Sequence, residues 1–150
     1  MTIKEQEPWL LLVEDDKNDQ RLFKRVVGTK DCPITIHTAD TVEEAVRILR
    51  SALDSAKPAW STPKLMVLDI NLPGQNGFYL LEKIRGCGPV KTLPVVIFST
   101  SNASEDRAYA DDLAATCFIK KPDSIEELRA VGREISHVWR SITAPNAKHQ

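Results

Sequence analysis

Carboxylates follow two short apolar runs of the sequence, and they have the clearest capacity for chemistry. Asp69 comes directly after the run 65–68, and Glu14 and Asp15 come directly after 9–13. A carboxylate can act as a nucleophile or as a ligand of a metal ion. Asp at the end of a strand can equally cap the next loop by accepting bonds from backbone N–H groups. At this stage both roles remain open for Asp69.

Hydroxyl groups and lysines follow two further apolar runs. Ser99 and Thr100 follow the run 94–98, and Lys120 and Lys121 follow 117–119. Each of these residues alone has an ordinary structural explanation, as a turn residue, a helix cap or a solvated surface lysine. Four apolar runs that all end in polar groups are harder to explain in this way.

These runs and the segments between them predict strands and helices in alternation. A short apolar run bounded by turn residues is typical of a buried parallel strand. Five strands are expected, at 9–13, 34–37, 65–68, 94–98 and 117–119. Five helices are expected at 16–28, 41–53, 77–86, 103–115 and 124–140, with a loop at 56–63.

Local signals mark several of these helices. Asp16 is expected to be the N-cap of the first helix. The segments 41–44 and 124–127 each match a capping box, Thr or Ser followed three residues later by Glu. The helix at 103–115 has a thin apolar stripe, which predicts the weakest packing and makes this helix a candidate moving part.

Strict alternation of strands and helices predicts a single-domain, doubly wound α/β fold with a five-stranded parallel sheet. The C-terminal ends of parallel strands lie along one edge, so the polar residues above are expected together. Three carboxylates there would repel one another unless a cation neutralised them, and oxygen ligands suit Mg²⁺. A lysine and a hydroxyl beside them could bind a phosphoryl group. The set therefore predicts phosphoryl transfer to an aspartate.

The motifs VEDD, LDINLPGQNG, PVVIFSTS and FIKKP occur in this order between about Trp9 and Arg140. Together they resemble the receiver domain of two-component response regulators. The resemblance implies the strand order 2-1-3-4-5 and a stand-alone receiver domain over 8–140, similar to chemotaxis regulators. Flexible termini are expected at 1–7 and 141–150.

The resemblance also implies roles for the acidic residues. Asp69 would be the phosphoacceptor and a ligand of Mg²⁺. Asp15 would bind the metal directly and Glu14 through water. Asn71, two residues after the phosphoacceptor, would bind it through its backbone carbonyl.

Switch residues follow from the same resemblance. Ser99 matches the switch hydroxyl, with Thr100 beside it as the alternative, and Lys121 before Pro122 matches the lysine of the family. Phe118 stands where the family often has tyrosine. Because Phe118 has no hydroxyl, any coupling through it must use packing of the ring.

The implied function is that of a response regulator in a phosphorelay. The chain would accept a phosphoryl group from a sensor histidine kinase or a phosphotransfer protein. It would signal through a face made by the fourth helix, fifth strand and fifth helix, which is also a possible homodimer interface. It is expected not to be an enzyme, apart from its own phosphorylation and slow dephosphorylation. The segments KNDQRLFKR and NLPGQNG further resemble receivers paired with phytochrome-type kinases.

Two other functions fit parts of the pattern. A binding module with a receiver fold would act without phosphorylation, but the complete set of acidic, hydroxyl and lysine residues argues against it. A magnesium-dependent phosphatase with an aspartate nucleophile requires a second Asp two residues later as general acid. That position is Asn71, which cannot donate such a proton.

Composition narrows the remaining classes. The 150 residues are 42% hydrophobic and 27% charged, as in ordinary globular domains, and the net charge of -1 gives no indication of nucleic acid or an anionic membrane as partner. No apolar run approaches the roughly 20 residues of a membrane span, and no signal peptide is evident, so a cytoplasmic protein is expected. Cys32, Cys87 and Cys117 form no CxxC pair, which favours reduced thiols over disulfides or zinc ligands.

Overall fold

The computed structural model describes residues 7–54 and 61–144, and within these ranges the strands form one parallel sheet. Its order is β2-β1-β3-β4-β5, as the resemblance implied. The strands are β1 (Trp9–Val13), β2 (Thr35–Ala39), β3 (Leu65–Leu68), β4 (Val95–Ser99) and β5 (Cys117–Lys120). The predicted fold class is therefore confirmed.

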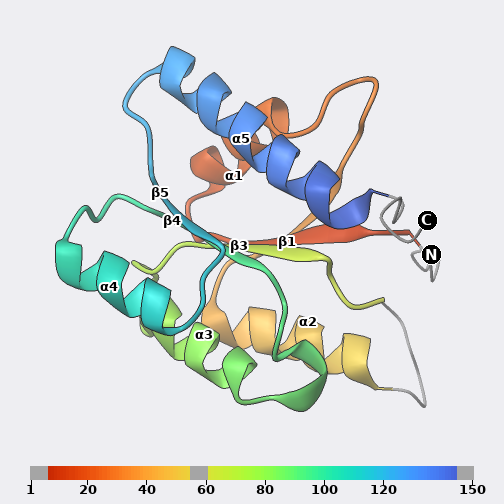
Figure 1. The fold of residues 1–150 in the computed structure, drawn as a ribbon, viewed down its shortest axis with the longest axis vertical. Coiled ribbons are helices and arrows are strands. Elements are labelled where there is room, and N and C mark those ends of the chain that lie inside the picture. The colour runs from red at the N-terminus through yellow and green to blue at the C-terminus, as the bar shows by residue number, and fades with distance from the viewer. Residues whose placement is uncertain (1–6, 55–60, 145–150) are drawn as a thin grey trace.

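Helices cover both faces of the sheet. They are α1 (Lys17–Val26), α2 (Val42–Leu53), α3 (Gly77–Arg85), α4 (Ser104–Asp112) and α5 (Ile125–Thr143), with a short 3₁₀ turn η1 (Gly88–Val90) after α3. Figure 1 shows α1 and α5 on one face and α2, α3 and α4 on the other. None of the helices in the described ranges has the length and apolarity needed to cross a membrane.

Alternate residues of the central strands supply the two halves of the core. Leu11, Val13, Met66 and Ile97 belong to the cluster that packs with α2 and α3. Their neighbours in the strands, such as Leu12 and Val67, belong to the cluster with α1 and α5. Both faces of these strands are buried, which explains why they appear in the sequence as continuous apolar runs rather than as an alternating pattern.

Both predicted capping boxes start a helix. Thr41 accepts a bond from the backbone N–H of Glu44 at 3.0 Å, and Ser124 accepts one from Glu127 at 3.1 Å. The two glutamate carboxylates accept bonds from the N–H of the residue before the cap, at 2.7 and 3.0 Å. The return bond thus falls one residue earlier than in the usual capping box.

Several boundaries differ from those expected. Strand β2 begins one residue late and continues to Ala39. Helix α4 ends at Asp112, because the chain turns through Ala114 with a left-handed φ of 58°. Helix α5 continues to Thr143, beyond the expected end at residue 140, because Ile142 still packs on the core. The expected flexible residues 1–6 and 145–150, and 56–60 of the expected loop, lie outside the described residues.

Parallel pairing continues one residue past several strands and so aligns their polar ends. The N–H of Glu14 bonds to the carbonyl of Ala39 at 3.0 Å, and the N–H of Asp69 bonds to that of Val13 at 3.0 Å. On the other side of the sheet, the N–H of Lys121 bonds to the carbonyl of Ser99 at 2.8 Å. These backbone bonds place the polar residues that follow β1, β3 and β5 at one edge of the sheet.

A glycine is required where α3 begins. The N–H of Gly77 bonds to the carbonyl of Ile70 at 3.0 Å, so the loop after β3 folds back onto the end of the strand. A Cβ atom at Gly77 would lie 2.5 Å from the carbonyl oxygen of Asp69. Only glycine permits this approach of the helix to the Asp69 backbone.

Candidate functional site

Three carboxylates gather at the sheet edge, as the sequence predicted. Ligand oxygens of Glu14, Asp15 and Asp69 all lie within 4.8 Å of one another. Glu14 and Asp69 are buried, with 2% and 5% of their surface exposed, while Asp15 is exposed. Two buried carboxylates so close together need a positive charge nearby.

Lys121 supplies this charge. Its ammonium lies 2.6 Å from Glu14 Oε1, 3.0 Å from Asp69 Oδ2 and 3.1 Å from Asp19 Oδ2. Only 12% of the Lys121 side chain is exposed. The neighbouring Lys120 is exposed, so the structure places Lys121 and not Lys120 among the carboxylates.

Burial and charge act in opposite directions on this cluster. Burial raises the pKa of Glu14 above its ordinary value, although Lys121 and the backbone N–H of Asp16 oppose the shift. Burial alone would lower the pKa of Lys121, but the carboxylates of Glu14 and Asp69 outweigh it and hold that pKa well above its usual range. Lys121 is therefore a permanent cation at physiological pH.

Asp69 caps the loop after β3 with one carboxylate oxygen and contacts Lys121 with the other. Its Oδ1 accepts a 2.9 Å bond from the backbone N–H of Asn71, which is the loop cap expected of Asp at a strand end. Its Oδ2 faces the ammonium of Lys121. The backbone bond orients the carboxylate, and the second oxygen remains in the charged part of the site.

The side chain of Asn71 extends the site toward β4. Its Nδ2 donates to Ser99 Oγ at 2.9 Å and more weakly to Thr100 Oγ1 at 3.3 Å. Ser99 is fully buried, and its hydroxyl also accepts a bond from the N–H of Ser101 at 3.1 Å. Thr100 is exposed. Both candidate hydroxyls thus contact Asn71, and the Ser99 hydroxyl makes the shorter bond to it.

Phe118 lies on β5, half-buried beside the core cluster that packs with α2 and α3. The guanidinium carbon of Arg107, on α4, lies 4.7 Å from the centre of its ring. Arg107 also donates a long 3.4 Å bond to Asn102, in the loop that follows Ser99. Arg107 therefore links α4 to β5 through a cation–π contact with the Phe118 ring, which has no hydroxyl to form a hydrogen bond.

Two residues of α1 in the site lie in the segment KNDQRLFKR, but the sequence analysis gave neither of them a role. Asp19 contacts Lys121, as described above. Gln20 is buried and donates from Nε2 to the carbonyl of Glu14 at 2.5 Å and to Asp40 Oδ1 at 2.8 Å. The available signals were weak: Asp19 lies in the first turn after the cap, and Gln20 lies three residues before the buried Phe23.

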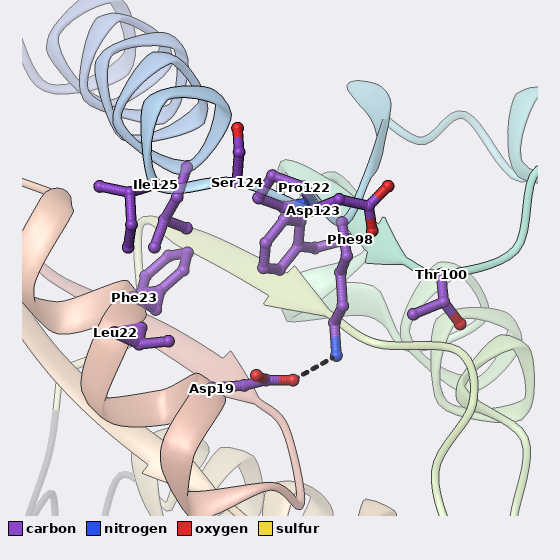
Figure 2. A pocket seen from close by; sticks show the side chains of 11 residues that line it. Asp19, Leu22, Phe23, Phe98, Thr100, Pro122, Asp123, Ser124 and Ile125 are labelled. Atoms are coloured by element: carbon purple, nitrogen blue, oxygen red, sulfur yellow. Dashed lines mark hydrogen bonds and ion pairs between the residues drawn. The ribbon is translucent and has the colours of Figure 1, made fainter.

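A groove of about 360 Å³ opens beside Lys121, between α1 and the start of α5. Figure 2 shows apolar side chains, among them Leu22, Phe23 and Ile125, along the side that α1 and α5 form. The dashed line there joins Asp19 to the ammonium of Lys121. The ion pair therefore lies where the groove meets the acidic cluster.

The donor atoms of the cluster fit a hard divalent cation. All of these donor atoms are carboxylate oxygens. Among the described side chains, the cluster has three carboxylates, and the Lys121 ammonium contacts two of them. Mg²⁺ and similar cations bind through a few such oxygens and keep several waters. The site can therefore hold a divalent cation next to Asp69.

Comparisons with known proteins agree with this geometry. The response regulator receiver domain model matches residues 10–132. Response regulator Rcp1 of Synechocystis sp. is 29% identical over 147 residues, which cover 92% of this chain and 93% of Rcp1. The phosphorylated cyanobacterial phytochrome response regulator RcpA is 32% identical, with a TM-score of 0.80 over 90% of this chain and 95% of that one. The Mn²⁺-bound form of Rcp1 is 26% identical, with a TM-score of 0.79 over 93% and 97%. The chain belongs to the response regulator receiver domain family.

Proposed function

We propose that this response regulator accepts a phosphoryl group on Asp69 from the phosphohistidine of a sensor histidine kinase or phosphotransfer protein. The observation that carries the proposal is the position of Asp69. It is buried at the end of β3, oriented by the N–H of Asn71 at 2.9 Å and faced by Lys121 at 3.0 Å. Family membership and the phosphorylated state of the similar RcpA support the same assignment.

We propose Mg²⁺ as the resident cation, held by Glu14, Asp15 and Asp69 with the backbone carbonyl of Asn71. The oxygen donor set of the cluster and the Mn²⁺-bound form of the similar Rcp1 support a divalent cation here. When bound, such a cation reduces the repulsion between a carboxylate and an incoming phosphoryl group.

In the proposed reaction the Asp69 carboxylate attacks phosphorus, an O–P bond forms, and the P–N bond to the donor imidazole breaks. Lys121 stays beside the attacking carboxylate and neutralises charge that develops on the phosphoryl oxygens. Asn71 keeps the carboxylate in its orientation through its backbone N–H. The chain would catalyse only its own phosphorylation and slow dephosphorylation, and would not be an enzyme in the usual sense.

Phosphorylation places about two negative charges beside Ser99 and Lys121. We propose that the Ser99 hydroxyl and the ammonium move toward them, with Thr100 as the alternative hydroxyl. Phe118 and α4 then repack as a two-state element. The output face is α4, β5 and α5, which binds a downstream protein or a second copy of the chain.

The donor is proposed to be a phytochrome-type histidine kinase. RcpA, 32% identical to this chain, is a phytochrome response regulator. A purified phytochrome kinase that has phosphorylated itself should transfer its phosphoryl group to this chain faster than an unrelated histidine kinase does. Equal rates from both donors would reject the phytochrome assignment.

The proposed place of action is the cytoplasm. Cys32, Cys87 and Cys117 are all free thiols, and free thiols are typical of proteins in reducing compartments. Fractionation of the cells that produce the protein tests this location.

The test of phosphorylation uses a small phosphodonor, acetyl phosphate, with Mg²⁺ or with a chelator. Intact mass spectrometry should detect one phosphoryl adduct that requires Mg²⁺, resists acid and is lost in base. Asp69→Asn should abolish the adduct, and Asp31→Asn, which removes an exposed carboxylate elsewhere, should not. An adduct of equal yield in Asp69→Asn would show that another residue is the acceptor. The absence of any adduct would favour a receiver fold that acts as a binding module.

A further inference from the structure

Asp19 is a carboxylate of the site with a position unlike that of the others. It lies in the first turn of α1, where its backbone N–H bonds to the cap residue Asp16 at 2.9 Å. Its Oδ2 lies 3.1 Å from the ammonium of Lys121. The Asp19 side chain is 40% exposed, while those of Glu14 and Asp69 are 2% and 6% exposed. Asp19 therefore contacts Lys121 from the open side of the cluster.

Among the described residues three carboxylates contact Lys121, and two of them also belong to the metal-ligand cluster. Glu14 and Asp69 would share a divalent cation with Asp15, and Asp19 is outside this group. A cation bound there competes with the ammonium for Glu14 and Asp69 and repels it directly. Asp19 is then the partner that continues to attract Lys121.

We propose that Asp19 is a positioning residue that anchors the Lys121 ammonium while a divalent cation occupies the acidic cluster. The anchor keeps the ammonium within reach of a phosphoryl group on Asp69. In Figure 2 Asp19 is labelled on α1, and the dashed line marks its interaction with the Lys121 ammonium. The proposal rests on the proposed phosphorylation of Asp69 and adds a residue to that site.

The structure distinguishes this role from a structural one. The Asp19 side chain caps no helix, because the capping carboxylate of α1 belongs to Asp16. Its contact with Lys121 joins elements that lie 102 residues apart in the sequence. Loss of the side chain should therefore release the ammonium without disturbing the start of α1.

The first experiment measures phosphorylation of the full chain by acetyl phosphate at saturating Mg²⁺. Asp19→Asn should lower the rate about two- to fivefold, the effect expected for one ion pair with a partly exposed partner. Asp19→Glu should retain most of the rate, because it preserves the charge. Asp16→Asn is the matched control, since it removes the same charge from the same end of α1 and leaves a residue that caps equally well.

A double-mutant cycle identifies the route of the effect. In a Lys121→Met background, Asp19→Asn should cause no further loss, because the group that it positions is gone. An equal loss in both backgrounds would overturn the proposal, since Asp19 would then act on the metal or the donor directly. A wild-type rate in Asp19→Asn would overturn it as well.

NMR can observe the Lys121 ammonium directly, without any phosphorylation reaction. With Mg²⁺ present, the Lys121 ammonium signal should be observable in wild type and in Asp16→Asn and should broaden or vanish in Asp19→Asn. An unchanged signal in Asp19→Asn would contradict the anchoring role. If Asp69 is not the phosphoacceptor, the result is distinct from all of these, because wild type itself would then carry no adduct on Asp69.

Discussion

At the residue scale, one ammonium balances carboxylates from three separate elements. Glu14 follows β1, Asp19 lies in α1 and Asp69 follows β3, and each places an oxygen within 3.1 Å of Lys121. A buried carboxylate without a partner is costly, and two that face each other are more so. Lys121 therefore stabilises the buried carboxylates of the cluster as well as serving the proposed reaction.

Replacement of Lys121 by Met should expose this dependence. Without divalent cations, Lys121→Met should lower the free energy of unfolding by roughly 1–3 kcal/mol, because buried carboxylates lose their charged partner. Added Mg²⁺ should raise the Tm more in this variant than in wild type, because the metal supplies the missing positive charge. Thermal unfolding with and without Mg²⁺ measures both effects.

The matched control is Lys120→Met, at the exposed neighbouring lysine. It should unfold like the wild-type chain in both conditions. An equal Mg²⁺-induced rise in Tm for wild type, Lys120→Met and Lys121→Met would show that Lys121 does not neutralise the cluster.

The roles of Asp69 and Lys121 could be predicted from the sequence, but those of Asp19 and Gln20 could not, and the reason is geometric. Asp69 and Lys121 follow strands, and any parallel sheet brings strand ends to one edge. Asp19 and Gln20 lie on a helix, where the direction of a side chain depends on how the helix is rotated against the sheet. The spacing of apolar residues in α1 indicates only which side of the helix faces the core, and it does not show which residues at the strand ends Asp19 and Gln20 contact.

At the element scale, α4 has the least support from the core. Of its residues only Ala110 is buried, while α3, also nine residues long, buries five. Its C-terminal end is tied to α3 by Arg85, which donates to the carbonyls of Leu113 at 2.8 Å and Ala114 at 3.0 Å. The helix is thus anchored at one end and thinly packed along its length.

Hydrogen exchange should detect this difference in packing. Amides of 104–112 in α4 should exchange at least about tenfold faster than those of 77–85 in α3, which has the same length. Mass spectrometry after pulse labelling of the native chain measures both segments in one sample. Equal protection of α3 and α4 would contradict the description of α4 as a candidate moving part.

The thin stripe of α4 was visible in the sequence, but its anchoring was not. Few apolar residues at helical spacing already predicted weak packing. The hydrogen bonds of Arg85 join α3 to the turn after α4. That turn passes through Ala114, which has a left-handed conformation. Non-glycine residues rarely adopt this conformation, so alanine gave no signal for a turn at that position.

At the scale of the whole molecule, the sheet brings distant segments together and its stability depends on pH. Glu14 and Lys121 lie 107 residues apart in the sequence and meet only when β1, β3, β4 and β5 are all in place.

On β2, burial lowers the pKa of His37 below its usual value, and Lys24 lowers it further. The folded state therefore disfavours protonation of this histidine.

Stability should accordingly fall as the pH drops below about 6.5, the ordinary pKa of histidine, because the unfolded chain then binds a proton that the folded chain resists. His37→Phe should reduce this loss between pH 7.5 and 5.5, since phenylalanine does not titrate and can retain the edge contact with Trp9. Urea unfolding at several pH values measures the difference. His137→Gln, at an exposed position of α5, is the control and should follow the wild-type curve. A His37→Phe curve parallel to wild type would contradict the prediction.

The central claim is that Asp69 is the phosphoacceptor, and chemical mapping of the modified residue tests it most directly. After reaction with acetyl phosphate and Mg²⁺, borohydride reduces an aspartyl phosphate to homoserine. Trypsin then releases the peptide 65–83, whose side-chain carboxylates are those of Asp69 and Glu82. Fragmentation of this peptide should place homoserine at position 69. Homoserine at another aspartate, or an unmodified peptide 65–83 from a chain that carries a phosphoryl group, would contradict the claim.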